Sequence, residues 1–171
     1  MSKPWVPDLY NNLKQLGISQ VSYVPDAGHA ELIKLFEADA DVHSVSLTTE
    51  EEGIAMAGGA WLGGAKSVML IQSSGVGNCI NMLALVQECR MPLLALVTMR
   101  GEWGEFNPWQ CPMGQSTQQA LEAAGVFVVR VDEGEDIPEA VRAAALLAFN
   151  SNRAVAVLIS QKVLGIKNFT K

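Results

Sequence analysis

Charged side chains are scarce in this sequence. Of its 171 residues only 18% are charged, against about 25% in an average soluble domain, while 49% are hydrophobic. The 12 Lys and Arg residues are outnumbered by 18 Asp and Glu residues, which gives a net charge of −6. Because the balance is acidic and the acids are scattered, nothing indicates a basic surface, and we expect no nucleic-acid partner.

Signals for membranes and for secretion are lacking as well. No apolar run reaches the roughly 18 residues of a membrane-spanning helix, and the N-terminal residues, with an early Asp8, do not resemble a signal peptide. Cys79, Cys89 and Cys111 are odd in number and show no CxxC spacing. They are typical of reduced thiols rather than of a disulfide framework or a zinc site. We therefore expect a cytoplasmic protein that does not contact membranes.

Several common functional motifs are missing. The sequence contains neither the GxGxxG nor the GxxxxGK[ST] pattern of nucleotide-binding loops, and it has no HExxH metal site. The Gly-x-Ser-x-Gly turn of serine hydrolases is also absent. We therefore expect no nucleotide fingerprint, no serine-hydrolase triad and no metal site made by this chain.

Strand-like and helix-like segments alternate along the whole chain. The strand-like segments are apolar on both faces, which is typical of a parallel sheet covered by helices on each side. We expect strands at 21–24, 42–47, 67–71, 93–98, 126–131 and 154–159, and helices at 5–16, 29–38, 50–62, 79–88, 117–124 and 137–149. The pattern predicts a single α/β domain over residues 1–171, with a three-layer, doubly wound, mostly parallel six-stranded sheet.

The hydrophobic surplus exceeds what one domain of this size buries by itself. Apolar surface that a domain cannot cover alone is typically covered by another protein. We therefore expect a large protein interface.

The segment 48–62 carries the most informative pattern. Three consecutive acids, Glu50, Glu51 and Glu52, stand between an apolar strand and a helix without any charged residue from 53 to 64. A helix that is apolar all round is buried, so we expect at least one of these acids to be drawn towards the interior. A carboxyl group in a dry place can exchange protons near neutral pH. A solvated first helical turn explains the same acids by dipole and capping effects, and the residues alone leave both interpretations open.

Other candidate residues also follow directly after strands. These segments are 25–29, the segment 72–78 (Gln-Ser-Ser-Gly-Val-Gly-Asn) and the loop that starts at Arg100. In a parallel sheet the carboxyl ends of the strands share one edge, where ligands bind. The glycines of 72–78 allow a ligand to approach the backbone closely, although a plain strand-to-helix turn explains them too.

Single residues at this edge allow two interpretations each. His29 is either a general acid or a surface residue at a helix start, whereas His43 lies on an expected strand and is better explained as a core residue. Arg100 is suited to binding a carboxylate or sulfonate with both of its nitrogens, or it is an ordinary surface arginine. The expected loop 100–115, with Trp103 and Trp109, is too long and too aromatic for a simple connection, and we expect an interface patch, a lid, or both.

The order of these motifs resembles the pyrimidine-binding (Pyr) domain of thiamine-diphosphate-dependent 2-oxo acid decarboxylases, the sulfopyruvate and phosphonopyruvate decarboxylases in particular. The matching pieces are Val24-Pro25, the segment 50–62, the segment 72–78, Arg100-Gly101 and the segment 110–117. They hold their order and spacing over nearly the whole chain. The resemblance implies the three-layer Pyr-domain fold.

The resemblance also implies roles for individual residues. In the family, a Glu nine residues before the Gly of a Gly-x-x-Leu sequence bonds N1′ of the cofactor's aminopyrimidine ring. Gly59-Ala60-Trp61-Leu62 fits that sequence, so the matching acid is Glu50, with Glu51 as the alternative if the register shifts by one. The cofactor implied is thiamine diphosphate, and the reaction releases carbon dioxide and an aldehyde from a 2-oxo acid. Residues implied to line the pyrimidine pocket are Pro25, Ser74, Gly75 and Gly77, and those implied on the substrate side are His29, Gln72, Asn78 and Arg100.

Family members hold the cofactor's diphosphate through Mg²⁺, with a Gly-Asp-Gly motif in a second (PP) domain. This sequence has no Gly-Asp-Gly. The resemblance therefore implies a separate PP-domain partner subunit that holds the diphosphate and Mg²⁺, and association between Pyr domains is expected as well.

Three functions remain open at this stage. The first is the Pyr subunit of a heteromeric decarboxylase acting on a small acidic 2-oxo acid. The second keeps the cofactor but joins carbon units, as acetolactate synthases do, and the third is a non-catalytic module that binds an anion or assembles with other proteins.

Overall fold

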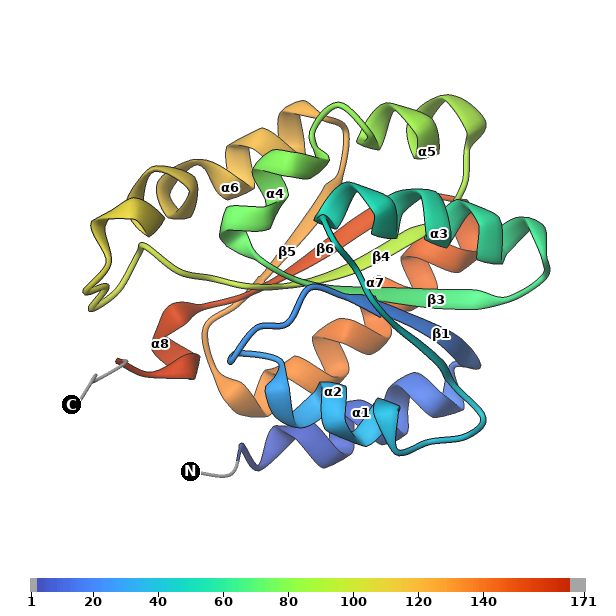
Figure 1. The fold of residues 1–171 in the computed structure, drawn as a ribbon, viewed down its shortest axis with the longest axis horizontal. Coiled ribbons are helices and arrows are strands. Elements are labelled where there is room, and N and C mark those ends of the chain that lie inside the picture. Colours follow the sequence, from blue (N-terminus) through green and yellow to red (C-terminus); the bar gives the residue numbers. More distant parts are fainter. Residues whose placement is uncertain (1–2, 167–171) are drawn as a thin grey trace.

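The computed structural model describes residues 3–166 and contains one sheet of six parallel strands (Figure 1). Their order across the sheet is β2-β1-β3-β4-β6-β5. The strands are β1 (Ile18–Tyr23), β2 (His43–Ser46), β3 (Lys66–Gln72), β4 (Leu93–Thr98), β5 (Phe127–Val131) and β6 (Ala154–Ile159). The expected parallel six-stranded α/β architecture is confirmed.

Helices cover both faces of the sheet (Figure 1). Helices α3, α4, α5 and α6 lie on one face, and α1, α2 and α7 lie on the other. The helices are α1 (Trp5–Gln15), α2 (Ala30–Glu37), α3 (Glu50–Leu62), α4 (Ser73–Cys79), α5 (Leu83–Cys89), α6 (Cys111–Ala123), α7 (Ile137–Ser151) and α8 (Gln161–Leu164), with short 3₁₀ turns η1 (Pro108–Gln110) and η2 (Gly134–Asp136). None of the helices within residues 3–166 combines the length and the hydropathy that crossing a bilayer requires.

The central strands supply both halves of the core. Every residue of β4 and β6 is buried, because each of these strands is covered by helices on both sides. Strand β2 lies at the edge of the sheet and is only partly covered. The expectation that His43 belongs to the core is therefore wrong, since this residue is exposed on that edge strand.

Two segments differ from the sequence-based expectation. The single helix expected over 79–88 is two helices, because the chain is already helical from Ser73 and breaks before Leu83. The expected loop 100–115 is shorter, since α6 begins at Cys111 with a proline in its first turn, where the missing N–H of proline costs nothing. Helix α4 contains two glycines, and one of them, Gly75, is buried and packs directly against Glu50.

The order of the strands reverses between β1 and β3. After β1 the chain passes through α2 to β2 at one edge, and it then crosses to β3 on the other side of β1. The crossover connections of these two neighbours therefore lie on opposite faces of the sheet, which is the position where α/β proteins bind ligands.

Candidate active site

Glu50 stands at the N-terminus of α3 and turns inward. Only 9% of Glu50 is exposed, whereas Glu51 and Glu52 are open to solvent. The Glu52 carboxylate accepts hydrogen bonds from the backbone N–H groups of Thr48 (2.9 Å) and Thr49 (3.4 Å), so it caps the helix. Each interpretation of the sequence therefore applies to a different acid. Glu50 is drawn inward, and Glu52 caps the helix.

Two residues of α4 surround the Glu50 carboxylate. The side-chain amide of Asn78 donates a hydrogen bond of 2.7 Å to Oε2. Gly75 lies against the same group, because a Cβ at this position would be 2.2 Å from Oε1 and 2.4 Å from Cδ. Within residues 3–166 no donor forms a hydrogen bond with Oε1, so this oxygen is available to a ligand.

Cys79 lies beside this carboxylate but is not reactive. Burial raises the pKa of its thiol to about 12, and the charge of Glu50 contributes in the same direction. A thiol in this state is neutral at physiological pH and is a poor nucleophile.

Asp26 connects the carboxyl ends of three strands. Its Oδ1 accepts a hydrogen bond of 2.7 Å from Nε2 of Gln72, and its Oδ2 accepts one of 2.7 Å from the hydroxyl of Thr98. The backbone N–H of Gly28 also donates to Oδ2, at 2.8 Å. Ser74 donates a hydrogen bond of 2.8 Å to Oε1 of Gln72, which extends the network to α4. We did not predict Asp26 from the sequence; the only available signal is an acid directly after the first strand.

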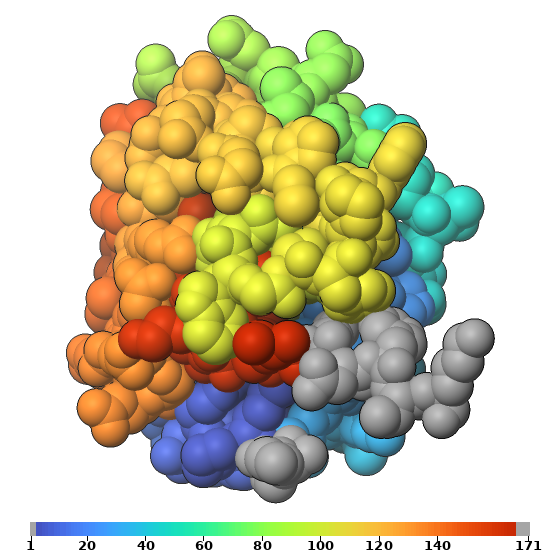
Figure 2. Space-filling view, turned by 90° about the vertical axis from the view of Figure 1, so that its left-hand side faces the viewer, coloured from blue at the N-terminus to red at the C-terminus, as the bar shows by residue number. Residues whose placement is uncertain are grey.

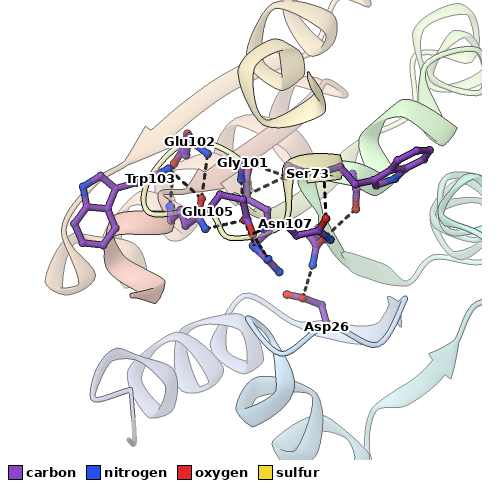
Figure 3. A network of polar contacts seen from close by, with 12 residues as sticks. Asp26, Ser73, Gly101, Glu102, Trp103, Glu105 and Asn107 are labelled. Carbon is purple, nitrogen blue, oxygen red and sulfur yellow. Dashed lines mark hydrogen bonds and ion pairs between the residues drawn. The ribbon is translucent and has the colours of Figure 1, made fainter. Parts of the chain in front are cut away.

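Arg100 forms a buried, bidentate ion pair. Its Nε and Nη2 donate to the two carboxylate oxygens of Glu105, at 2.7 and 2.6 Å, and the side chains are only 8% and 3% exposed. Backbone N–H groups of Gly101 and Asn107 also donate to Glu105 (Figure 3). Arg100 is the main reason why the pKa of Glu105 is lowered to about 2. The role of Glu105 was missed, because an acid five residues after an arginine in a loop is no recognisable motif.

Gln161, the first residue of α8, also binds the loop that follows β4. The side-chain oxygen of Gln161 accepts hydrogen bonds from the backbone N–H groups of Glu102 (3.0 Å) and Trp103 (3.1 Å). Nε2 of Gln161 donates to Glu105 at 2.9 Å. These contacts give the loop a fixed shape next to the ends of β4 and β6 (Figure 3).

A cavity of about 70 Å³ lies between the Asp26 and Arg100 groups. Lys3, Asp26, Arg100 and Gln161 contribute polar side chains to its lining. It is large enough for a small polar group and has both acidic and basic side chains at its wall.

His29 has a different environment from the other candidates. It is 1% exposed, and its Nε2 lies 3.2 and 3.0 Å from the backbone oxygens of Ile71 and Leu96. Since both neighbours are acceptors, Nε2 carries the proton. Burial lowers the pKa of His29 to about 4, so the ring is neutral at pH 7. The structure thus places His29 beneath the ends of β3 and β4, and its contact with a substrate stays a prediction.

The remaining candidates lie at the rim. Pro25 is exposed in the turn after β1, and Gly77 is exposed on α4, where a Cβ would be 3.4 Å from Sδ of Met113. The structure therefore brings the predicted residues into two groups. One consists of Glu50, Gly75 and Asn78, and the other consists of Gln72, Ser74 and Arg100 together with Asp26.

Large apolar side chains are exposed around this edge. Trp103 is 45% exposed, Phe106 50% and Trp109 83%. Leu62, 75% exposed, ends α3 at the opposite edge of the sheet, just before β3. Figure 2 shows the segment of the three aromatic residues, in yellow-green and yellow, lying next to α8, in red. Helix α3 is thus buried on one side only within this chain.

Comparison with known proteins relates the chain to a family. Residues 8–124 match the family described as thiamine pyrophosphate enzyme, N-terminal TPP binding domain. The chain is 32% identical over 152 residues to sulfopyruvate decarboxylase subunit alpha of Methanococcus maripaludis, which covers 88% of this chain and 91% of the relative.

Two longer relatives match over part of their length. The chain is 35% identical over 152 residues to sulfopyruvate decarboxylase of Methanosarcina acetivorans, covering 88% of this chain and 38% of that protein. It is 36% identical over 117 residues to phosphonopyruvate decarboxylase of Streptomyces viridochromogenes, covering 67% of this chain and 30% of that protein.

Solved structures share the fold. A thiamin diphosphate-dependent enzyme from Mycobacterium smegmatis, described as putative, aligns with a TM-score of 0.74 at 18% identity, covering 99% of this chain and 34% of that chain. Benzoylformate decarboxylase from Polynucleobacter necessarius aligns with a TM-score of 0.72 at 16% identity, covering 99% of this chain and 32% of that chain. The present chain thus spans about a third of each of these two proteins.

Proposed function

The chain belongs to the family of N-terminal TPP-binding domains of thiamine pyrophosphate enzymes, and from this premise we propose that it is the Pyr subunit of a heteromeric decarboxylase. The proposed substrate is a small acidic 2-oxo acid similar to sulfopyruvate or phosphonopyruvate, and the products are an aldehyde and carbon dioxide. The names of the relatives support this reaction.

The residues present fit the pyrimidine ring of thiamine diphosphate. Glu50 is buried and keeps Oε1 without a hydrogen-bond donor from residues 3–166, and the absence of a side chain at Gly75 lets the Glu50 carboxylate pack against α4. We assign to Glu50 the hydrogen bond with N1′, and to Pro25, Ser74, Gly75 and Gly77 the lining of the ring. The exposure of Glu51 supports Glu50 as the acting acid. When bound, the cofactor supplies the electron sink for decarboxylation, and the protein supplies position and electrostatics.

The substrate side is proposed to lie at the second group of residues. Glu105 takes the N–H of Nε and one N–H of Nη2 of Arg100, so the two N–H groups of Nη1 and the second N–H of Nη2 are left for an acidic group of the substrate. The ion pair holds the guanidinium rigidly, which favours recognition because little side-chain entropy is lost on binding. Asp26 lines the cavity beside Arg100, and Gln72 donates a hydrogen bond to Asp26. The buried position of His29 suits a role in holding the strand ends together rather than direct contact with the substrate.

The rest of the enzyme is proposed to be a separate subunit. A PP-domain partner with a Gly-Asp-Gly motif would hold the diphosphate and Mg²⁺, and residues 1–171 would form one Pyr domain. The exposed Trp103 and Trp109 support an interface of this kind, since obligate interfaces are rich in apolar and aromatic side chains. Association between two Pyr domains belongs to the same proposal. The three free cysteines, one of them exposed, support a reducing, cytoplasmic location.

The buried Glu50 with one free carboxylate oxygen is the observation that carries this function. The test is decarboxylation by the complex of the Glu50→Gln variant with its partner. We expect nearly all turnover to be lost, while Glu51→Gln, which changes an exposed acid one residue away, keeps it. Retained turnover in Glu50→Gln would overturn the assignment.

Two further experiments separate the alternative functions. Product analysis with pyruvate separates decarboxylation from carbon–carbon joining. A stable monomer that copurifies with no second chain would favour a non-catalytic module.

A further inference from the structure

Asn78 has a more specific position than the sequence suggested. It lies in α4, and its side-chain Nδ2 donates the 2.7 Å hydrogen bond to Oε2 of Glu50. The amide therefore points at the proposed cofactor-activating acid and not at the cavity beside Arg100. We propose that Asn78 is a positioning residue, which holds the Glu50 carboxylate in the one orientation that leaves Oε1 for the cofactor ring. This inference rests on the proposed function of Glu50.

Two contacts on opposite sides of the carboxylate determine its orientation. Gly75 allows Oε1, Cδ and Cγ of Glu50 to lie where any other side chain would place its Cβ, at 2.2 to 2.5 Å. Asn78 binds the other oxygen, Oε2. Because the two oxygens of a carboxylate are chemically equivalent, only their surroundings decide which one meets a ligand. Because Asn78 binds Oε2, Oε1 is the oxygen that remains for a ligand.

An amide is chemically suited to this task. It donates a hydrogen bond without carrying a charge, so it satisfies Oε2 without forming an ion pair that would hold Glu50 permanently ionised. A lysine or arginine in its place would do the latter, and an aspartate would repel the carboxylate. With Asn78 the carboxylate keeps its ability to share a proton with a weakly basic ring nitrogen.

The exposure of Asn78 makes it easy to test. Most substitutions of an exposed polar residue change stability little, and Asn78 is exposed while its amide reaches inward. We would measure the affinity of the complex, formed with the partner subunit, for thiamine diphosphate and for an analogue with C–H in place of N1′. The ratio of the two affinities reports the hydrogen bond to N1′ directly.

The order of three variants gives the first readout. For Asn78→Ala we expect the preference for thiamine diphosphate over the analogue to fall about 10-fold, since a hydrogen bond to a charged group is lost. For Asn78→Asp, which has nearly the same shape but no donor, we expect a larger fall, because two acids then face each other. The kcat should fall in the same order with the KM for the 2-oxo acid unchanged. Asn81→Ala, a nearby exposed control, should behave as the wild type. If Asn78→Asp has the same affinity ratio and kcat as the wild type and only Asn78→Ala is impaired, Asn78 acts by its shape alone and the proposal is overturned.

A double-mutant cycle gives the second readout. If Asn78 acts through Glu50, Asn78→Ala has no further effect on the affinity ratio in the Glu50→Ala background. An undiminished effect in that background would overturn the positioning role while leaving the function of Glu50 intact. If Glu50→Ala alone leaves the ratio unchanged, the proposed function itself fails, and the two failures are thereby distinguished.

Discussion

At the scale of single residues, position 75 shows how closely the Glu50 carboxylate is enclosed. A methyl group there would come within 2.2 Å of Oε1, a separation that real structures do not tolerate. The glycine is therefore required by its neighbour and not by its own backbone, since its φ is not positive.

We expect Gly75→Ala to lower turnover about 100-fold, because the carboxylate must move by a distance that catalysis does not tolerate. Steady-state kinetics of the complex with its partner would measure this. Gly59→Ala is the matched control, since nothing lies within 4 Å of its Cβ position on α3. Its free energy of unfolding should rise by about 0.5–1 kcal/mol, as for glycine replaced by alanine in a helix. Equal turnover in Gly75→Ala and the wild type would show that Glu50 does not act from this position.

His29 gives a prediction about pH. Its pKa is lowered by burial from 6.5 to about 4 in the folded protein, so folding favours the neutral ring. This contribution to stability is fully present above about pH 6.5 and is lost as the pH falls towards 4. We expect it to amount to roughly 3 kcal/mol, measurable by urea unfolding between pH 4 and 8. A His29→Gln variant should be less stable than the wild type at pH 7.5 and less sensitive to pH over this range. If both proteins show the same dependence on pH, His29 does not titrate as described.

At the scale of secondary-structure elements, the apolar strands were predictable and the glycine-rich helix was not. Strand β4 reads as a continuous apolar run and was expected at its observed bounds. Strand β1 begins at Ile18 rather than at residue 21, because pairing with β2 and β3 includes the polar Gln20. Helix α4 was expected as a turn, since its glycines disfavour a helix locally. Its contacts with Glu50 and Met113 come from distant parts of the chain and cannot be derived from local sequence.

The loop after β4 depends on the ion pair between Arg100 and Glu105. In Glu105→Gln we expect the free energy of unfolding to fall by about 3 kcal/mol, because a buried arginine loses its charge partner. The backbone amides of Gly101 and Asn107, which bind Glu105, should exchange hydrogen faster. Denaturant unfolding and hydrogen exchange measure the two effects.

Glu133→Gln makes the same chemical change in an exposed ion pair. Glu133 and its partner Lys162 are 60% and 55% exposed, so the loss should stay below about 1 kcal/mol. Similar losses in the two variants would mean that burial adds nothing to the Arg100 pair.

At the scale of the whole molecule, the sequence predicted which segments meet at one edge of the sheet better than which contacts hold them together. The convergence of segments at one sheet edge follows from the parallel topology, and Glu50, Gln72, Ser74 and Arg100 do lie at the carboxyl edge of the strands. Asp26, which connects three strand ends, was missed, because its partners are far apart in the sequence. Only the register of the sheet brings them within hydrogen-bonding distance.

The exposed apolar side chains at this edge carry the last prediction, which concerns assembly. Trp109 is 83% exposed and belongs to η1, directly before α6, whose Met113 lies near Gly77 on the helix that contacts the Glu50 carboxylate. A tryptophan in this position is the kind of residue that dominates binding energy once it is buried by a partner. We expect Trp109→Ala to weaken the affinity for the PP-domain subunit at least 30-fold, which corresponds to about 2 kcal/mol. Calorimetric titration of the two subunits would measure it. Phe127→Ala is the control, because Phe127 is 48% exposed but starts β5 at the opposite edge of the sheet. If both variants bind as the wild type does, the partner covers a different face, and it does not approach Glu50 from the side of Trp109.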